Sequence, residues 1–314
     1  MKTNAKTSEN KPALRFAAGA LAMIIAVSML SGCQKKIDDE PDPSVTQATT
    51  TPSTQPSETE ATTLTTLPLS FTMPERAPPL LPPEPEPLEK YLEFYEQNNE
   101  FVGWISIPSL TNSRGEMYID YPVVQADDNS KYIDTDFYGE ESKSGAIYAD
   151  YKVPITATSH ADNITLFGHS MADGTYFRHI IDYREGVDFV KEHYLINFDT
   201  RWEENQYVVV ACFLIGIYEW QGDEPLFEYF KCRNFETEED FNYFYDNIMY
   251  RSYYLSDINC EWGDEFITLS TCAYDFDDSR FVVVARKVRD GEDISGYADT
   301  YVKNPDRHRP SILD

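Results

Sequence analysis

Eight short runs rich in β-branched and aromatic residues, each bounded by turn-forming residues, follow one another between residues 103 and 288. They read GWISI, MYIDYPVV, GAIYAD, NITLFG, YLINF, YVVVACFLIGIY, EFITLSTC and RFVVVARKV, and begin near residues 103, 117, 145, 163, 194, 207, 265 and 280. Runs of this length and composition form strands, and their close spacing is typical of barrels. The sequence therefore predicts a mainly β fold with a closed or nearly closed eight-stranded β-barrel.

Three segments have the apolar spacing of helices. LEKYLEFYEQN follows Pro87, and proline is favoured in the first turn of a helix. GTYFRHIIDY, near residue 174, has apolar residues on one side. ETEEDFNYFYDNIMY, near residue 236, starts with acidic residues that suit a helix N-terminus and continues with aromatic residues at helical spacing. We expect an N-terminal helix docked on the barrel and a helix in the long connection between strands six and seven.

The first 33 residues have the pattern of an export signal. A leader with four positive charges and one negative charge precedes the uncharged stretch from Phe16 to Cys33. These 18 residues are few for a membrane span, which needs about 20 apolar residues. Leu30-Ser31-Gly32-Cys33 is similar to a bacterial lipobox, in which the cysteine thiol receives a lipid. Lipidation of Cys33 and an uncleaved membrane helix both stay open, and either would tether the protein to the outer face of the cell membrane.

Residues 34–86 differ in composition from the remainder of the chain. Ten threonines lie between Ser44 and Thr66, and seven prolines lie between Pro74 and Pro87. A segment with so few apolar residues cannot build a packed core. We expect a disordered linker over 34–86 and one folded catalytic-sized domain over 87–314.

Charge and cysteine content limit the classes of partner. The chain has a formal charge of −28, and residues 87–314 hold 19 basic and 44 acidic residues, a charge of −25. This excludes a nucleic-acid partner, because phosphate binding needs clustered Lys and Arg. The five cysteines have neither a disulfide-scaffold nor a zinc-ligand spacing, and a pairing of Cys232 with Cys260 stays open. We expect the acidic residues to form a solvated surface, and a preference for cationic partners or occasional calcium binding near Asp275, Asp277 and Asp278 stays open.

Cys272 ends one β-rich run, and Arg280 begins the next. A lone strand cysteine is usually a small core residue. However, a hairpin between these two runs would place Cys272 and Arg280 at one rim of the barrel, where a guanidinium can hydrogen-bond an oxyanion. The pair therefore favours a nucleophile over a core residue.

A thiol nucleophile needs a base, and imidazole is the usual partner. His169 follows the apolar run NITLFG, where Gly168 frees the backbone and a loop begins at Ser170. This is the position of a side chain presented at the end of a strand. The other four histidines lie in loops, helical segments or the charged tail: His160, His179, His193 and His308. We predict His169 as the base.

Three motifs now occur in a fixed order: DNSKYI after YPVVQ, NITLFGHSM with His169, and TLSTC followed by Arg280. Together they resemble the motifs of the class B sortases, cysteine transpeptidases of Gram-positive cell surfaces. The resemblance covers about residues 88–290. It implies a sortase-type barrel with no cofactor and no metal. The helix near 236 fits the long connection of class B, and it argues against the calcium-binding loop of class A.

The resemblance also implies roles for individual residues. Cys272 would attack the carbonyl of a Thr in a C-terminal sorting signal of exported proteins, and His169 would act as acid and base. Arg280 would stabilise the oxyanion together with a backbone N–H, that of Ala273. The thioester would then pass to an amino group of peptidoglycan, and we expect the enzyme to act as a monomer.

Four residues are expected to contact the peptide substrate in addition to Ala273: Asn129, Ile133, Ser270 and Thr271. Asn129 and Ile133 match the groove-lining pattern of the family, although Asn129 as a simple turn former in ADDNS stays open. Ser270 and Thr271 directly precede the nucleophile.

Two features depart from the family pattern. Class B sortases usually have a membrane-spanning N-terminal helix, which leaves the anchoring through Cys33 open. Ala273 replaces the acidic or polar residue that often follows the nucleophile, which suggests that this position contributes its backbone. The alternatives are a secreted cysteine hydrolase with the same acylation step, a pilin-type polymerase, and a lipid-anchored binding module with a degenerate site.

Overall fold

The structure is a computed structural model that describes residues 83–314. The helices are α1 (Glu89–Gln97), α2 (Val187–Glu192), α3 (Glu238–Arg251) and α4 (Tyr297–Thr300). The strands are β1 (Phe101–Ser106), β2 (Asp120–Val124), β3 (Ile147–Ala149), β4 (Asn163–Phe167), β5 (Leu195–Thr200), β6 (Gln206–Ile215), β7 (Tyr254–Leu255), β8 (Phe266–Cys272), β9 (Arg280–Lys287) and β10 (Val302–Lys303). Short 3₁₀ helices include η1 (Lys131–Ile133), η2 (Phe177–Arg184), η3 (Glu219–Gln221), η4 (Tyr229–Lys231) and η5 (Ser311–Leu313). Cys33, the predicted export signal and the predicted linker up to residue 82 lie outside the described residues.

The expected closed eight-stranded barrel is confirmed. Its strands follow the order β1-β2-β3-β4-β8-β9-β6-β5, and each predicted run supplies one of them. The pairs β2–β3 and β4–β8 are parallel, whereas the other neighbours are antiparallel. Because parallel neighbours need a long connection, β4 and β8 are joined through η2, α2, β5, β6 and α3.

The strands β6, β8 and β9 are buried along almost their whole length. Their inner faces fill the barrel, while η2 contacts all three from outside and α3 covers β6. Strands covered on both faces read as continuous apolar runs, which explains the unbroken sequences VVVACFLI and FVVVA. Of these buried strands, β8 ends at Cys272 and β9 begins at Arg280.

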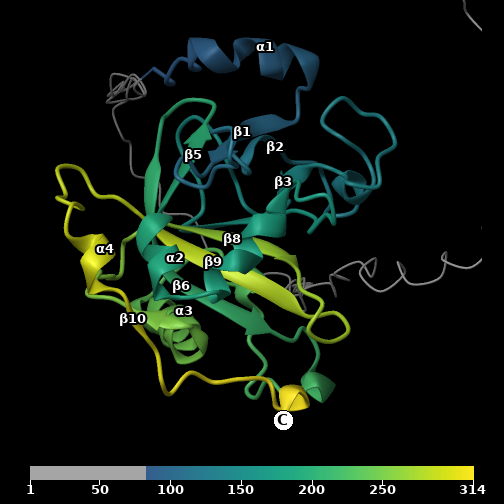
Figure 1. Cartoon of the computed structure of the whole chain (residues 1–314). Coiled ribbons are helices and arrows are strands. Elements are labelled where there is room, and N and C mark those ends of the chain that lie inside the picture. Colours follow the sequence, from purple (N-terminus) through teal and green to yellow (C-terminus); the bar gives the residue numbers. More distant parts are fainter. Residues whose placement is uncertain (1–82) are drawn as a thin grey trace, which may run out of the picture.

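The helices α1 and α3 lie on opposite sides of the barrel (Figure 1). Tyr91 of α1 packs its ring near Phe101 and Trp104 of β1, and its hydroxyl donates to Asp199 at 2.7 Å. The helix α3 lies in the connection between the sixth and seventh barrel strands. It begins with a capping box, in which Thr237 and Asp240 satisfy each other's backbone N–H groups.

The helical segment expected near residue 174 begins at Phe177 and is a 3₁₀ helix. The preceding residue, Tyr176, has a φ of 57°, which no helix continues through. Over residues 83–314, no helix has the length and apolar character needed to cross a membrane. Within the same residues Cys232 and Cys260 are both unbridged, so the pairing left open between them does not form.

Candidate active site

Strand register brings His169, Cys272 and Arg280 to one end of the barrel. Cys272 and Arg280 are direct partners in the antiparallel β8–β9 ladder. On the other side of β8, Phe167 of β4 pairs in parallel with Ser270. His169 lies two residues after Phe167, and Cys272 lies two residues after Ser270. The two residues are therefore at the same level along the parallel strands. The three predicted catalytic residues lie at the ends of three adjacent strands.

The imidazole of His169 is held by the backbone of η1. Its Nε2 lies 2.8 Å from the carbonyl oxygen of Ile133. A carbonyl can only accept, so Nε2 carries the hydrogen and donates it. Nδ1 is then the nitrogen through which the ring can exchange a proton. Ile133, predicted to contact substrate, here orients the histidine through its backbone.

Arg280 is buried, with 6% of its surface exposed, and its Nη1 donates to the carbonyl of Ser279 at 3.1 Å. The backbone N–H of Ala273 donates to the same carbonyl at 2.9 Å. The hairpin thus engages the Ala273 N–H, and the expected role of this N–H as an oxyanion donor stays a prediction. The hydroxyl of Ser279 also donates to the Ala273 carbonyl at 2.8 Å, which closes the turn.

Two tyrosines that the sequence motifs did not indicate lie beside Cys272 and Arg280. Burial raises the pKa of Tyr148, the positive charge of Arg280 works against this rise, and Cys272 adds to it. The same three influences act on the pKa of Tyr229, in the same directions. Tyr229 comes from η4 in the long β6–β8 connection, where only a folded structure relates it to the strand ends.

Ser270 and Thr271 are buried, with 1% and 2% of their surfaces exposed. The hydroxyl of Ser270 lies 2.7 Å from that of Tyr229, and Thr271 Oγ1 donates to the Gly168 carbonyl at 2.7 Å. The expectation that these two side chains contact substrate is not supported by their burial and pairing. Thr271 instead ties the end of β8 to the segment that carries His169.

Asn129 joins two loops. Its side-chain Oδ1 accepts a hydrogen bond from the backbone N–H of Tyr151 at 3.1 Å. This links the loop after β2 to the turn after β3, as a structural residue does, while its side chain is half-buried. Within residues 83–314 no cluster of three acidic, His or Cys side chains is arranged to hold a metal ion, and Asp275 instead pairs with Arg184 at 2.8 Å.

The chain is similar in sequence to known sortase B proteins. No protein-family profile matches the chain. Sortase B of Staphylococcus aureus is 30% identical over 209 residues, which cover 66% of this chain and 75% of that protein. Sortase B of Listeria monocytogenes is 28% identical over 194 residues, which cover 61% of this chain and 71% of that protein.

Solved structures agree with these relatives. A substrate complex of S. aureus sortase B superposes with a TM-score of 0.54 at 28% identity, over 64% of this chain and 85% of that one. A sortase B-like protein from Bacillus anthracis gives a TM-score of 0.54 at 28% identity, over 65% and 84% of the two chains. With the barrel and the order of its motifs, these similarities lead to one conclusion: the chain belongs to the class B sortases and is a transpeptidase of that family.

Proposed function

We propose that this sortase cleaves a C-terminal sorting signal of exported proteins after a Thr residue and attaches the new carboxyl end to an amino group of peptidoglycan. The observation that carries the proposal is the strand register, which brings His169, Cys272 and Arg280 together at one barrel end. An acid/base, a thiol and an oxyanion donor are the three groups that acyl transfer through a thioester requires.

In the first half-reaction the sulfur of Cys272 attacks the Thr carbonyl carbon, and the thiol proton passes to Nδ1 of His169. The tetrahedral intermediate collapses as the C–N bond breaks. His169 returns the proton to the leaving amine. The hydrogen bond from Nε2 to Ile133 is kept throughout, because Nε2 carries its hydrogen in both the neutral and the charged ring.

Arg280 stabilises the oxyanion. Its guanidinium is held at the rim by burial and by the bond from Nη1 to Ser279, and a planar fork fixed in this way presents its N–H donors in a set geometry. Because the N–H of Ala273 is engaged in the hairpin, Arg280 carries more of this task than the motifs suggested.

In the second half-reaction an amine attacks the thioester, gives its proton to His169 and releases Cys272. Solved complexes of related sortases with a substrate and with triglycine support a reaction between a peptide donor and an amine. Binding of the amine next to the thioester gives it a high effective concentration relative to water. This separates transfer, and hence cell-wall anchoring, from simple hydrolysis.

The proposed location is the outer face of the cell membrane. The support is the charged leader, the uncharged stretch and the Leu30-Ser31-Gly32-Cys33 sequence. Metabolic labelling with a fatty-acid probe separates the two forms of anchor. If the wild type takes up the label and the Cys33→Ala variant does not, Cys33 carries a lipid. If the unlabelled variant stays in the membrane fraction, the anchor is an uncleaved helix.

The reaction is tested by incubating the full chain with a library of sorting-signal peptides and a model amine. Mass spectrometry should find a thioester on Cys272 and a product joined to the amine. A Cys272→Ala variant should fold and give neither. If product forms without incorporating the amine at any concentration, the protein is a hydrolase and the transfer proposal is wrong.

A further inference from the structure

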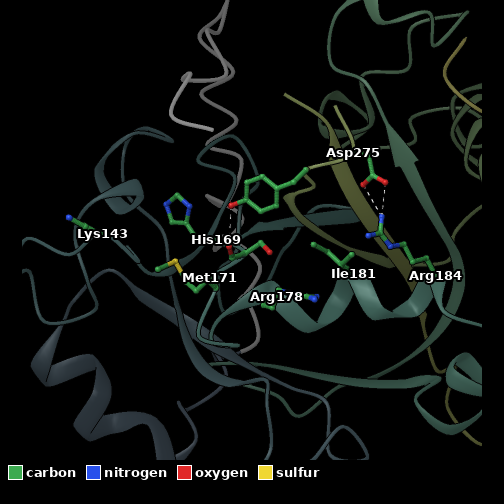
Figure 2. A pocket seen from close by; sticks show the side chains of 10 residues that line it. Lys143, His169, Met171, Arg178, Ile181, Arg184 and Asp275 are labelled. Carbon is green, nitrogen blue, oxygen red and sulfur yellow. Dashed lines mark hydrogen bonds and ion pairs between the residues drawn. The ribbon is translucent and has the colours of Figure 1, made fainter. Parts of the chain in front are cut away.

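An aromatic pocket of about 210 Å³ lies between α1, β1, β2 and the loop that joins η1 to β3. Six of its ten lining residues are aromatic: Phe94, Trp104, Tyr121, Phe137, Tyr138 and Tyr176. It shares no lining residue with the pocket beside His169, which Figure 2 shows with the cationic side chains of Lys143, Arg178 and Arg184. Its volume is below that of a typical small-molecule site, about 300–1,000 Å³, and suits the rings of a peptide segment.

The rings of this aromatic pocket are packed in pairs and still reach the surface. Tyr121 and Tyr176 are stacked, with ring centroids 5.0 Å apart and planes 6° from parallel. The ring centroids of Phe94 and Trp104 are 4.8 Å apart. These four side chains are half-buried, and Tyr138 is 70% exposed. Apolar surface that gathers in one exposed place is typical of an interaction site.

The polar groups of the pocket indicate what a ligand must carry. Asp136 is the charged residue among the ten, and its Oδ1 accepts hydrogen bonds from the backbone N–H groups of Tyr138 and Glu140 at 2.9 and 3.0 Å. The hydroxyl of Tyr121 accepts from the backbone N–H of Tyr176 at 3.1 Å, so its own hydrogen can be donated. A fitting ligand therefore has apolar rings, carbonyl oxygens that accept, and a positive charge.

A segment just before the described residues has all three properties. Residues 76–82 read RAPPLLP. Arg76, Pro79 and Pro82 are three positions apart, so a polyproline helix, with three residues per turn, would carry them on one edge. Arg76 is also the only basic residue in the sequence between Lys36 and Lys90. Proline-rich segments bind aromatic-lined grooves because their extended helix is formed in advance and loses little entropy.

The segment is long enough to reach the pocket. Leu88 is fixed by a hydrogen bond from its backbone N–H to the Arg201 carbonyl at 2.8 Å. Phe94, on the pocket wall, lies six residues later, about 9 Å along α1. The seven residues from Arg76 to Pro83 span up to about 22 Å as a polyproline helix. A segment that turns back along α1 therefore brings Arg76 and Pro79 to the pocket.

We infer that residues 76–82 dock in the aromatic pocket of their own chain as a polyproline helix, with the prolines against the rings and Arg76 toward Asp136. The inference goes beyond the proposed transfer reaction and does not depend on it. Residues 34–75 then remain as the tether. The loop that supplies Asp136 and Tyr138 follows η1, whose Ile133 carbonyl holds His169, so the tether joins the domain beside the loop that orients the base.

Photo-crosslinking in the full chain tests the docking. The photoreactive residue p-benzoylphenylalanine is placed at position 138, where the native tyrosine lines the pocket and is 70% exposed. After irradiation and digestion, mass spectrometry should find position 138 joined to residues 74–84. The control carries the same probe in place of Tyr274, which is also 70% exposed but lies in the β8–β9 connection. This control should not give the product.

Linker variants, made in the chain with the probe at position 138, identify the groups that bind. Replacing Pro79 and Pro82 together by alanine removes rings and preorganisation, and should lower the crosslink yield about fivefold or more. Arg76→Gln should lower it about two- to fivefold, the effect of a surface ion pair. Replacing Pro52 and Pro56 by alanine removes as many prolines elsewhere in the linker and should leave the yield unchanged. Thermal melting checks that each variant is folded.

The inference fails if position 138 does not crosslink to residues 74–84, or does so no more than position 274. A yield that is insensitive to the loss of Pro79 and Pro82 also overturns it. Irradiating a mixture of isotopically light and heavy chains identifies the occupant, because light-to-heavy products would mean a second copy and contradict docking within one chain. Crosslinking requires no turnover, so failure of Cys272 to form a thioester would overturn the proposed function and leave this result as it stands.

Discussion

The carbonyl oxygen of Ile133 accepts a hydrogen bond from Nε2 of His169, at 2.8 Å, and the same carbonyl lies against Gly145. Gly145 has a φ of +56°, and a Cβ built on it would lie 2.6 Å from the Ile133 oxygen and 2.2 Å from that of Tyr132. Both contacts are too close for any side chain. The orientation of the predicted base therefore depends on a glycine 24 residues before it in the sequence.

Gly145→Ala should displace the Ile133 carbonyl and misalign His169. We expect a loss of about 10²-fold in acylation rate, because a misplacement of about 1 Å can have this effect. Single-turnover measurement of thioester formation checks this.

Gly139→Ala is the matched control. Gly139 lies in the same loop with a φ of +84°, but a Cβ there meets no atom within 4 Å. Both variants should lose about 1–2 kcal/mol of stability from the left-handed backbone, and Gly145→Ala should lose more because its Cβ meets two backbone oxygens. Only Gly145→Ala should lose activity, and equal activities in the two variants would show that the Ile133 carbonyl does not position His169.

Arg280→Lys keeps the charge and removes the planar fork. Loss of an oxyanion donor costs about 2.7–4 kcal/mol, or 10² to 10³ in rate, and we expect this loss in thioester formation with little change in melting temperature. Arg289→Lys is the control, because Arg289 pairs with Asp264 outside the site and should tolerate the change. Near-normal acylation by the Arg280 variant would mean that Arg280 is only a structural neighbour of Cys272.

Thiol labelling should distinguish Cys272 from the other described cysteines. Burial raises the pKa of Cys232 and of Cys260 to about 12, and raises that of the buried Cys212 still further. At pH 8 these thiols are almost wholly protonated and unreactive. Iodoacetamide should modify Cys272 first and abolish turnover, as peptide mapping with Cys33 counted separately would show. Labelling of Cys232 or Cys260 at a comparable rate would contradict this.

Acid should destabilise the protein through Glu292. Partial burial raises the pKa of this carboxyl, but hydrogen bonds from the Arg286 guanidinium, the Tyr297 hydroxyl and the Arg289 backbone outweigh it and lower the pKa from 4.5 to about 2. Because the pKa falls on folding, the carboxylate stabilises the protein fully above about pH 4.5 and loses this effect as the pH falls toward 2.

Glu292→Gln should therefore lower the melting temperature at pH 7, and the difference from wild type should shrink between pH 5 and 2. Tyr297→Phe removes one of the donors and should show a smaller part of the same effect. A difference that stays constant over this range would mean that the ionised carboxylate is not what stabilises the fold.

The barrel could be predicted because each strand has a recognisable local sequence pattern. The eight runs are short, rich in β-branched residues and separated by turn residues. The interval from Cys272 to Arg280 suits a hairpin in which these two residues are cross-strand partners, as the structure has them. The position of His169 at the end of a predicted strand indicated it as the base, but only the family motifs placed it beside this hairpin, because β4 and β8 are distant in sequence.

Other features of the site have no local signal. In a strand buried on both faces, such as β8, alternation does not tell which side chains point outward, so Ser270 was assigned to substrate although it is buried against Tyr229. The hairpin bond that occupies the Ala273 N–H depends on the exact turn geometry. The Ile133 carbonyl is backbone, which every residue has, and sequence cannot single it out.

The parallel pairing of β4 with β8 also determines when catalysis can begin. His169 and Cys272 are 103 positions apart, and Arg280 begins the last barrel strand. Closing so large a loop is slow, because the chain entropy is lost before the contacts form. A chain that appears from its N-terminus has the histidine long before the cysteine, and we expect it to be inert until residue 287 is available to complete the ladder. Because of this topology, Cys272 has its catalytic partners only in a chain that is complete through β9.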